Sequence, residues 1–275
     1  MNATTGLLYF SPSGTTKHVC QQIANGFDNR NEIIDLDITS FGNRSTVAGT
    51  IDAALGNCNH VVIGAPVYMG KLPLLVKEFL VSLDGKGTSC SAVVVYGNRD
   101  YGVALKNMVE ILSERNFSVI GAGAFIGRHS YADIVPMAIG RPDTSDDEKA
   151  DEFGGQLSKT TTPIRIGDIP FTIDKFSKSD SYSSMPPVYS KKRCTQCGKC
   201  AKVCPVGILA DNGTFRSNDL KKKCIGCTAC VTICNDGGRS LPANGIIKLL
   251  MGIMMKKAIR YRMEPVTVLG EPANG

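Results

Sequence analysis

The first 160 residues alternate short runs of apolar, β-branched residues with longer amphipathic stretches. Runs that are apolar on both faces, such as residues 61–67, are typical of strands that helices cover on both sides. Strands that alternate with helices are joined by right-handed crossovers into a parallel sheet. The pattern predicts an α/β doubly wound parallel five-stranded sheet in the order 2-1-3-4-5. Its strands are expected at 6–10, 32–38, 60–67, 91–96 and 118–126, and its helices at 16–27, 72–83, 102–115 and 145–158.

The apolar pattern weakens after residue 160, and residues 177–190 are rich in Ser and Pro. This composition is typical of a linker. We expect a first domain at 1–160, a linker at 161–185, a small α+β domain at 186–245 and a basic amphipathic tail at 246–275. The apolar runs of the small domain are too short for an independent core, so a metal or a cluster is expected to stabilise it.

Eight of the eleven cysteines lie between residues 194 and 234, in two runs of the spacing C-x2-C-x2-C-x3-C. Three cysteines at two-residue intervals can wrap one loop around three corners of a cubane cluster. The fourth cysteine lies a helical turn onward, points away from that loop, and ligates the other cluster of the pair. The spacing therefore predicts two [4Fe-4S] clusters. One is assigned to Cys194, Cys197, Cys200 and Cys234, and the other to Cys224, Cys227, Cys230 and Cys204.

Two four-cysteine zinc sites are the alternative, although zinc ribbons use two pairs of cysteines per metal rather than a run of four ending in Cys-Pro. Between the two runs, Asp211-Asn212-Gly213 predicts the turn of a small hairpin. Residues 186–240 resemble the bacterial ferredoxins that hold two [4Fe-4S] clusters. Asn235 stands where many members of that family have Pro, a position that is not a ligand.

A hydroxyl-rich segment, residues 11–17, follows the first predicted strand and opens the first predicted helix. A helix N-terminus offers free backbone N–H groups and the positive end of the helix dipole, which together favour a phosphate group. The segment matches neither GxGxxG nor GxxxxGK[ST], so the sequence gives no dinucleotide fingerprint and no Walker loop. A simple capped turn is the alternative interpretation of these residues.

Two later loops strengthen the case for a ligand, because ligands of doubly wound sheets bind beyond the carboxyl ends of the strands. Residues 66–71 and 97–102 follow the third and fourth predicted strands, and each loop carries a Tyr. With the hydroxyl-rich segment, these loops resemble the phosphate loop and the two ring loops of flavodoxins, over residues 4–160. The resemblance implies FMN. It maps the phosphate to Ser11, Ser13, Gly14, Thr15 and Thr16, the ring faces to Tyr68 and Tyr101, and the ring edge to Pro66, Val67, Gly97 and Asn98.

Arg99 belongs to the same loop as Tyr101. We hypothesise that Arg99 approaches the N1/O2 edge of the flavin and raises its reduction potential; a solvated arginine is the alternative. Either tyrosine could instead be a rim residue that covers apolar surface. His129 follows the fifth strand and is a candidate for proton transfer, although a lone histidine in a loop is usually a surface group. The remaining cysteines, Cys20, Cys58 and Cys90, are expected to be buried small apolar residues.

The charge is divided unevenly, with a net −4 over residues 1–185 and a net +10 over residues 186–275. A basic half could indicate nucleic-acid binding. Two oxidised clusters and a flavin phosphate would, however, each offset positive charge, and no helix-turn-helix pattern is present. We therefore expect no nucleic acid and instead expect the remaining basic charge to steer acidic redox partner proteins.

The apolar stretch 245–259 is interrupted by three lysines and is too short to span a bilayer. An amphipathic helix of this kind usually packs on its own protein, and a peripheral membrane contact or a partner is the alternative. The N-terminus lacks a basic segment and a cleavage site, so a cytoplasmic protein is expected.

The whole chain resembles the flavodoxin–ferredoxin fusion proteins of anaerobes, the EFR-type family. That resemblance implies an electron-transfer protein that passes low-potential electrons between FMN, two [4Fe-4S] clusters and external redox partners. A flavin-dependent oxidoreductase that reduces a small substrate with electrons from the clusters is the alternative, so the sequence leaves open whether the protein is an enzyme. A third reading, a redox-sensing regulator that binds nucleic acid, has no supporting motif.

Overall fold

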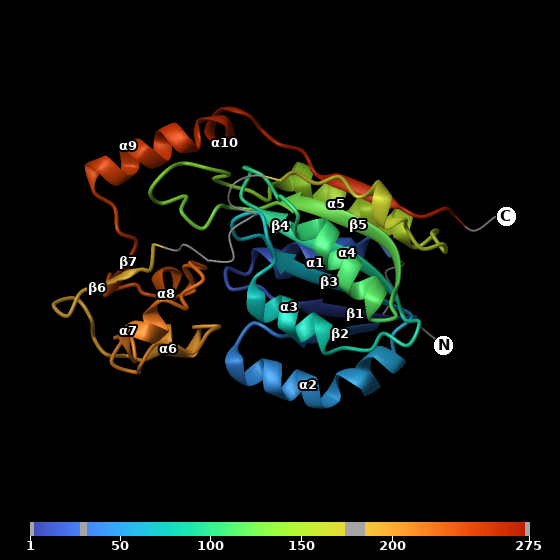
Figure 1. The fold of residues 1–275 in the computed structure, drawn as a ribbon, viewed down its shortest axis with the longest axis horizontal. Helices are drawn as coiled ribbons and strands as arrows, with labels where there is room; N and C mark the ends of the chain where they lie inside the picture. Colours follow the sequence, from blue (N-terminus) through green and yellow to red (C-terminus); the bar gives the residue numbers. More distant parts are fainter. Residues whose placement is uncertain (1–2, 28–31, 174–184, 273–275) are drawn as a thin grey trace.

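The computed structural model describes residues 3–27, 32–173 and 185–272 (Figure 1). Its main sheet has six strands in the order β2 (Glu32–Asp37), β1 (Thr4–Tyr9), β3 (His60–Pro66), β4 (Ser89–Tyr96), β5 (Ser118–Ile126) and β8 (Val266–Leu269). The first five strands are parallel, which confirms the predicted order 2-1-3-4-5.

A sixth strand, which the sequence did not predict, extends the five-stranded parallel sheet. β8 runs antiparallel to β5, with Leu269 opposite Gly121 and Val266 opposite Ala124. The glycine at 121 has no side chain, and a Cβ there would lie 2.5 Å from Leu157 and 3.2 Å from Leu269. Because β8 pairs with β5, the chain returns to the first domain after the cysteine-rich segment.

Helices cover both faces of the sheet, as a buried parallel sheet requires. α1 (Thr15–Asn25) and α5 (Thr144–Leu157) share one apolar core with the sheet. α2 (Phe41–Gly56), α3 (Leu74–Val81) and α4 (Ala104–Glu114) share the core on the opposite face. The sequence predicted four of these helices and missed α2, because α2 buries only Ile51 and Leu55 and has no apolar stripe to reveal it.

The cysteine-rich segment forms a small second module (Figure 1). β6 (Val188–Tyr189) pairs antiparallel with β7 (Arg239–Ser240), and three one-turn helices lie between them: α6 (Lys199–Lys202), α7 (Asn218–Lys221) and α8 (Ala229–Thr232). The predicted hairpin is present, because Leu209 bridges Phe215 and the Ala210 N–H donates to the Thr214 carbonyl at 2.9 Å. Its own core comprises only Cys200, Ile208 and Leu209.

The segment predicted as a linker at 161–185 is only partly described, because residues 174–184 lie outside the described residues. Its described part packs on the first domain. The Ile164 N–H donates to the Val119 carbonyl at 2.9 Å, Ile169 is buried in the core, and a 3-10 turn forms at η1 (Ile166–Asp168). Residues 161–173 therefore extend the first domain.

The predicted tail is divided between two helices and β8. α9 (Gly245–Met254) and α10 (Lys256–Arg260) follow the second module, and the chain then returns to the sheet (Figure 1). The expected packing against the protein occurs on one side only, where Met251 and Ala258 join Ile134, Val135 and Met137 in a small core. None of the described helices is both long and apolar enough to cross a membrane.

Candidate functional site

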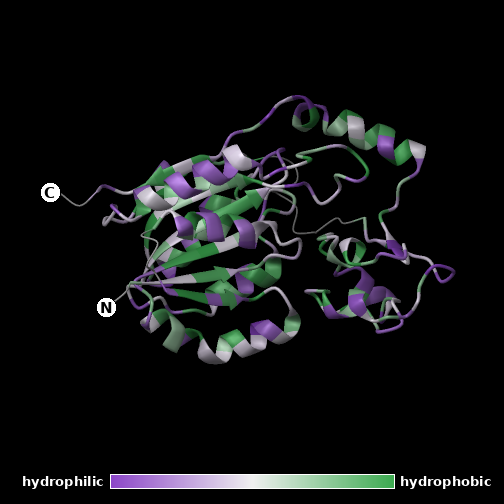
Figure 2. Ribbon diagram, turned by 180° about the vertical axis from the view of Figure 1, so that it is seen from behind, coloured by the Kyte–Doolittle hydropathy of each residue, from purple (hydrophilic) through white to green (hydrophobic). Residues whose placement is uncertain are grey.

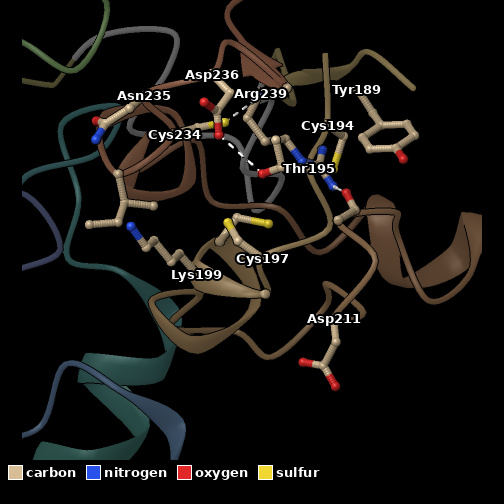
Figure 3. A pocket seen from close by; sticks show the side chains of 15 residues that line it. Tyr189, Cys194, Thr195, Cys197, Lys199, Asp211, Cys234, Asn235, Asp236 and Arg239 are labelled. Atoms are coloured by element: carbon tan, nitrogen blue, oxygen red, sulfur yellow. Dashed lines mark hydrogen bonds between the residues drawn. The ribbon is translucent and has the colours of Figure 1, made fainter. Parts of the chain in front are cut away.

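Four cysteines of the second module, three of them labelled in Figure 3, line a pocket of about 160 Å³. This outer quartet comprises Cys194, Cys197, Cys200 and Cys234. Backbone N–H groups point at two of its sulfurs: Gln196 donates to Cys194 Sγ at 3.4 Å, and Arg239 donates to Cys234 Sγ at 3.3 Å. Such bonds favour a charged thiolate, which is the form that ligates iron.

The other four cysteines surround a second, narrower pocket of about 20 Å³ that is lined by apolar side chains. This inner quartet comprises Cys204, Cys224, Cys227 and Cys230. Burial raises the pKa of the Cys230 thiol to about 12 and that of the Cys227 thiol further. The donor set, rather than the volume, fits a [4Fe-4S] cluster here, because such a cluster takes four sulfurs from a C-x2-C-x2-C run and a distant cysteine.

The structure thus groups the eight cysteines into the two crossed sets that the spacing predicts. In the described part of the chain, no group of three or more His, Cys, Asp or Glu side chains is arranged to hold a single metal ion. Cys20 and Cys90 are buried and Cys58 is half-buried, and none of these three lines either pocket.

The two cysteine loops have the same backbone shape although their residues differ. Two residues after the first cysteine of each run, Gln196 and Gly226 have φ of 57° and 68°. Four residues after it, Gly198 and Thr228 have φ of 72° and 61° and begin the short helices α6 and α8. The left-handed residues are therefore part of a repeated loop design, in which glycine occupies one of the two positions in each copy.

Arg239 lies between the two quartets with a side chain only 2% exposed. Its guanidinium donates to the carbonyls of Pro187 and Gly213 and lies 4.6 Å from the Phe215 ring centroid. Among the described residues its Nε finds no hydrogen-bond partner. Its charge lowers the pKa of Cys200 and of Cys230, opposing the stronger effect of burial on both thiols. No motif in the sequence marks this residue.

A third pocket of about 320 Å³ lies beyond the carboxyl ends of β3 and β4. Seven of the residues that the flavodoxin resemblance assigns to FMN line it: Ser13, Thr15, Thr16, Pro66, Val67, Tyr68 and Gly97. The hypothesised Arg99 lines it as well. Gly97 is required by packing, since a Cβ there would lie 2.4 Å from the His129 ring. The pocket lies at the place where a doubly wound sheet binds its ligand.

The predicted phosphate end of this pocket is the N-terminus of α1. Gly14 is the N-cap of the helix, with φ of 82°, and as a glycine it has no side chain to accept a bond from the first turn. Ser11 does not line the pocket; its Oγ accepts from the Lys17 N–H at 2.9 Å and so shapes the loop. Open backbone N–H groups with the hydroxyls of Ser13 and Thr15 nearby fit a phosphate.

Besides Ser11 and Gly14, two further assigned residues lie outside the lining of this pocket, Asn98 and Tyr101. The Asn98 side chain instead donates to the carbonyls of Ala258 and Tyr261, both at 2.7 Å, and so fastens the segment after α10. The Tyr101 ring packs edge-on against Tyr96 at 5.4 Å. Tyr101 therefore does not line the pocket on a ring face, as the flavodoxin resemblance implied.

Tyr96 is one of the lining residues that the sequence pattern did not reveal, because it ends β4. Its hydroxyl is buried with no hydrogen-bond partner among the described residues. Burial also raises the pKa of that hydroxyl, so it is a neutral donor at pH 7.

The rest of this pocket comes from the other half of the chain. Ile225 and Gly226, which lie between two cysteines of the inner quartet, form part of its wall. Met185, Met251, Met254 and Met255 add an apolar roof. Burial, with Cys227 as a smaller cause, raises the pKa of the Tyr68 hydroxyl. No local motif could reveal this wall, because its residues are more than 80 positions from the flavin loops.

His129 also lines the pocket. Burial and, to a smaller extent, the charge of Arg99 lower its pKa to about 4. The imidazole is therefore neutral at pH 7, and its Nδ1 accepts the Tyr131 N–H at 3.0 Å.

Comparison with known proteins agrees with both halves of this arrangement. A flavodoxin domain model matches residues 7–100, and a 4Fe-4S dicluster domain model matches residues 186–235. The comparison with curated proteins finds no match. These models define the class of the protein: a redox protein whose domains imply FMN and iron–sulfur clusters. The chain is a flavodoxin–ferredoxin fusion, and its place in the EFR-type family stays a prediction.

Solved structures resemble the first domain. A flavodoxin from the domain Archaea is 17% identical and has a TM-score of 0.41, over 56% of this chain and 96% of that chain. The Flv1 flavodiiron core from Synechocystis sp. PCC6803 is 16% identical and has a TM-score of 0.42, over 57% of this chain and 35% of that chain. A diflavin flavoprotein A3 from Nostoc sp. is 13% identical and has a TM-score of 0.38, over 57% of this chain and 92% of that chain.

Proposed function

We propose that the protein passes low-potential electrons between FMN, two [4Fe-4S] clusters and external redox partner proteins. When bound, FMN supplies a two-electron store and each cluster a one-electron store. The observation that supports this proposal is the wall shared by two sites. Ile225 and Gly226 line the flavin pocket, and they belong to the loop that carries Cys224 and Cys227 of the inner quartet.

Buried apolar side chains connect the first domain and the second module. Ile225, Cys227 and Ala229 belong to the same buried apolar core as β3, β4 and their covering helices. At the edge of this contact, the Arg44 guanidinium donates to the Pro205 carbonyl and to the Ile38 carbonyl at 3.1 Å. A charged donor on a carbonyl is one of the stronger hydrogen bonds in proteins, so this contact favours one fixed spacing.

The proposed order of transfer is flavin, inner quartet, outer quartet and partner. Cys197 of the outer quartet is exposed, whereas Cys227 of the inner quartet is buried. Exposed lysines lie near the outer quartet: Lys199 lines its pocket, and Lys191 and Lys192 precede Cys194 by two or three residues. A basic rim of this kind attracts acidic surfaces over long range and raises the rate of encounter.

The alternative, reduction of a small substrate at FMN, needs an open flavin face and a proton donor. The methionine roof covers one side of the pocket. His129 is neutral at pH 7 because its pKa lies at about 4. Both features favour the electron carrier.

The test is intramolecular electron transfer in the anaerobic holoprotein. We expect a light pulse that reduces the flavin to be followed by bleaching of cluster absorbance, with a rate that does not depend on protein concentration. Arg44→Ala should slow this rate, because the contact with Pro205 is lost. Arg115→Ala is the matched control, since Arg115 donates to the Leu83 carbonyl within the first domain.

Two results would contradict the proposal. One is a rate that rises in proportion to protein concentration, which indicates transfer between molecules. The other is absence of transfer in a preparation whose flavin and iron contents are full.

A further inference from the structure

The helix α9 presents a second apolar face that nothing in the described structure covers. Its inner side packs through Ile247, Met251 and Met255 against the loop after β5. The outer side carries four large aliphatic residues that are more than half exposed: Ile246 at 70%, Leu249 at 64%, Leu250 at 55% and Ile253 at 65%. Figure 2 shows α9 as a largely hydrophobic helix at the edge of the molecule.

These four residues form one stripe, because their spacing of i, i+3, i+4 and i+7 places them on the same side of a helix. A continuous exposed apolar stripe is unusual for a protein surface and marks a contact with something else. The stripe is adjacent to Met254, which also lines the flavin pocket.

The charge beside the stripe indicates what it contacts. Lys248, Lys256, Lys257 and Arg260 are exposed, and in the described part of the chain no acidic side chain forms an ion pair with any of them. The sequence has no Asp or Glu between residues 237 and 263. Tyr261, also exposed, follows the last of these cations.

We propose that α9 and α10 seat the protein on the surface of a bilayer that contains anionic phospholipids. A helix with an apolar stripe and flanking lysines lies in the interface, with its aliphatic residues among the acyl chains and its cations at the headgroups. Each cation near an anionic surface contributes on the order of 1 kcal/mol. The helix is seated in the surface and does not cross it, in agreement with its length of 10 residues.

A second copy of the chain is a poorer occupant of the same face. In a symmetric dimer the same patch of both subunits meets, so the four cations of one copy would lie against the four of the other. Like charges brought together in this way disfavour the contact, whereas anionic headgroups neutralise them.

The experiment is flotation of the full-length holoprotein with lipid vesicles. We expect the protein to float with vesicles of phosphatidylcholine and phosphatidylglycerol and to stay behind with phosphatidylcholine alone. High salt should reduce the floating fraction, because it screens the cations. Ile253→Asp and the double variant Lys256→Glu/Lys257→Glu should each abolish flotation, since one interrupts the stripe and the other reverses its flanking charge.

Matched controls exclude a general effect of the substitutions. Phe41→Asp removes an exposed aromatic residue on α2, and Lys191→Glu/Lys192→Glu reverses an adjacent pair of exposed lysines in the second module. Both controls should float like the unmodified protein, and all variants should keep their flavin and cluster absorbance, which reports the fold.

The proposal is overturned if the unmodified protein fails to float with anionic vesicles, if it floats equally with neutral ones, or if the controls lose binding as much as the α9 variants. A dimer that Ile253→Asp dissociates, in a protein that does not bind vesicles, would assign the face to a second copy and equally overturn it. None of these outcomes bears on electron transfer between flavin and clusters.

Discussion

The first domain and the second module are stabilised by different interactions. The first domain buries a large apolar core on each face of its sheet. The second module buries only Cys200, Ile208 and Leu209 in a core of its own, and two of its surfaces are cysteine-lined pockets. Apolar burial is enough to fold the first region, whereas a segment of this size with so small a core depends on its clusters. Loss of the clusters should therefore affect the two regions unequally.

Removal of iron should have the largest effect. When a chelator strips the anaerobic protein, we expect the second module to lose its structure while the first domain stays folded, because only the module relies on metal ligation. Hydrogen exchange measures this directly at the Ala210 amide of the hairpin and at the Val93 amide of β4. Equal protection of Ala210 before and after chelation would show that the module folds without clusters.

Single cysteine substitutions should distinguish the functions of the inner and outer quartets. Cys227→Ser and Cys197→Ser should each reduce the iron content from about eight to about four per chain, since each removes a ligand of one cluster. The Cys227 variant should also lose electron transfer from the flavin, because the inner quartet adjoins the flavin pocket. The Cys197 variant should keep that step and lose transfer to partners. Identical behaviour of the two variants in a flash-photolysis experiment would contradict the distinction between inner and outer quartets.

Arg239 offers a smaller change within the same module. Its buried positive charge between the quartets favours the reduced, more negative clusters. Arg239→Met should therefore lower the cluster reduction potentials in an EPR-monitored titration, and Arg239→Lys should restore part of the loss. Arg193→Met is the control, because Arg193 is exposed next to Cys194. Unchanged potentials in an Arg239→Met protein with full iron content would exclude this influence.

A lower pH should reduce the stability of the first domain through His60. This side chain is buried between Ser89 and Ser91, and burial lowers its pKa to about 3. Because the folded pKa lies below the unfolded value, the neutral imidazole stabilises the fold above about pH 6.5, and this contribution declines as the pH falls towards 3. Between pH 6.5 and 5 the loss amounts to about 2 kcal/mol of unfolding free energy.

Urea unfolding, followed by circular dichroism at both pH values, measures this loss. The variant His60→Gln has no group that titrates in this range, so its unfolding free energy should change less between the two values. If both proteins lose the same free energy, His60 does not carry the effect.

The sequence was a good guide wherever the signal was local. The spacing of the cysteines predicted both quartets, and the apolar runs predicted the five parallel strands in their order. Ser13 and Thr15 could be predicted as pocket residues because a strand, a turn and a helix start follow one another directly. Residues that reach the flavin pocket from distant parts of the sequence give no local signal. For this reason Met251 and Met255 were not predicted as pocket residues.

Asn98 and Tyr101 show a different limit. Both lie in a loop that matches the flavodoxin pattern, yet the Asn98 side chain holds the segment after α10 and Tyr101 packs on Tyr96. The short strand β8 was also missed, because four residues after a long intervening segment do not indicate which edge they join. Pattern predicts which residues lie in a loop, whereas tertiary packing decides which of them face the pocket.

The pairing of β8 with β5 has a consequence for biosynthesis. A ribosome releases the first five strands well before residues 266–269 emerge, so the edge of β5 stays open while the cysteine-rich module is being made. The segment that follows the module is joined to the sheet only when β8 pairs with β5. The clusters can therefore be loaded before this pairing forms.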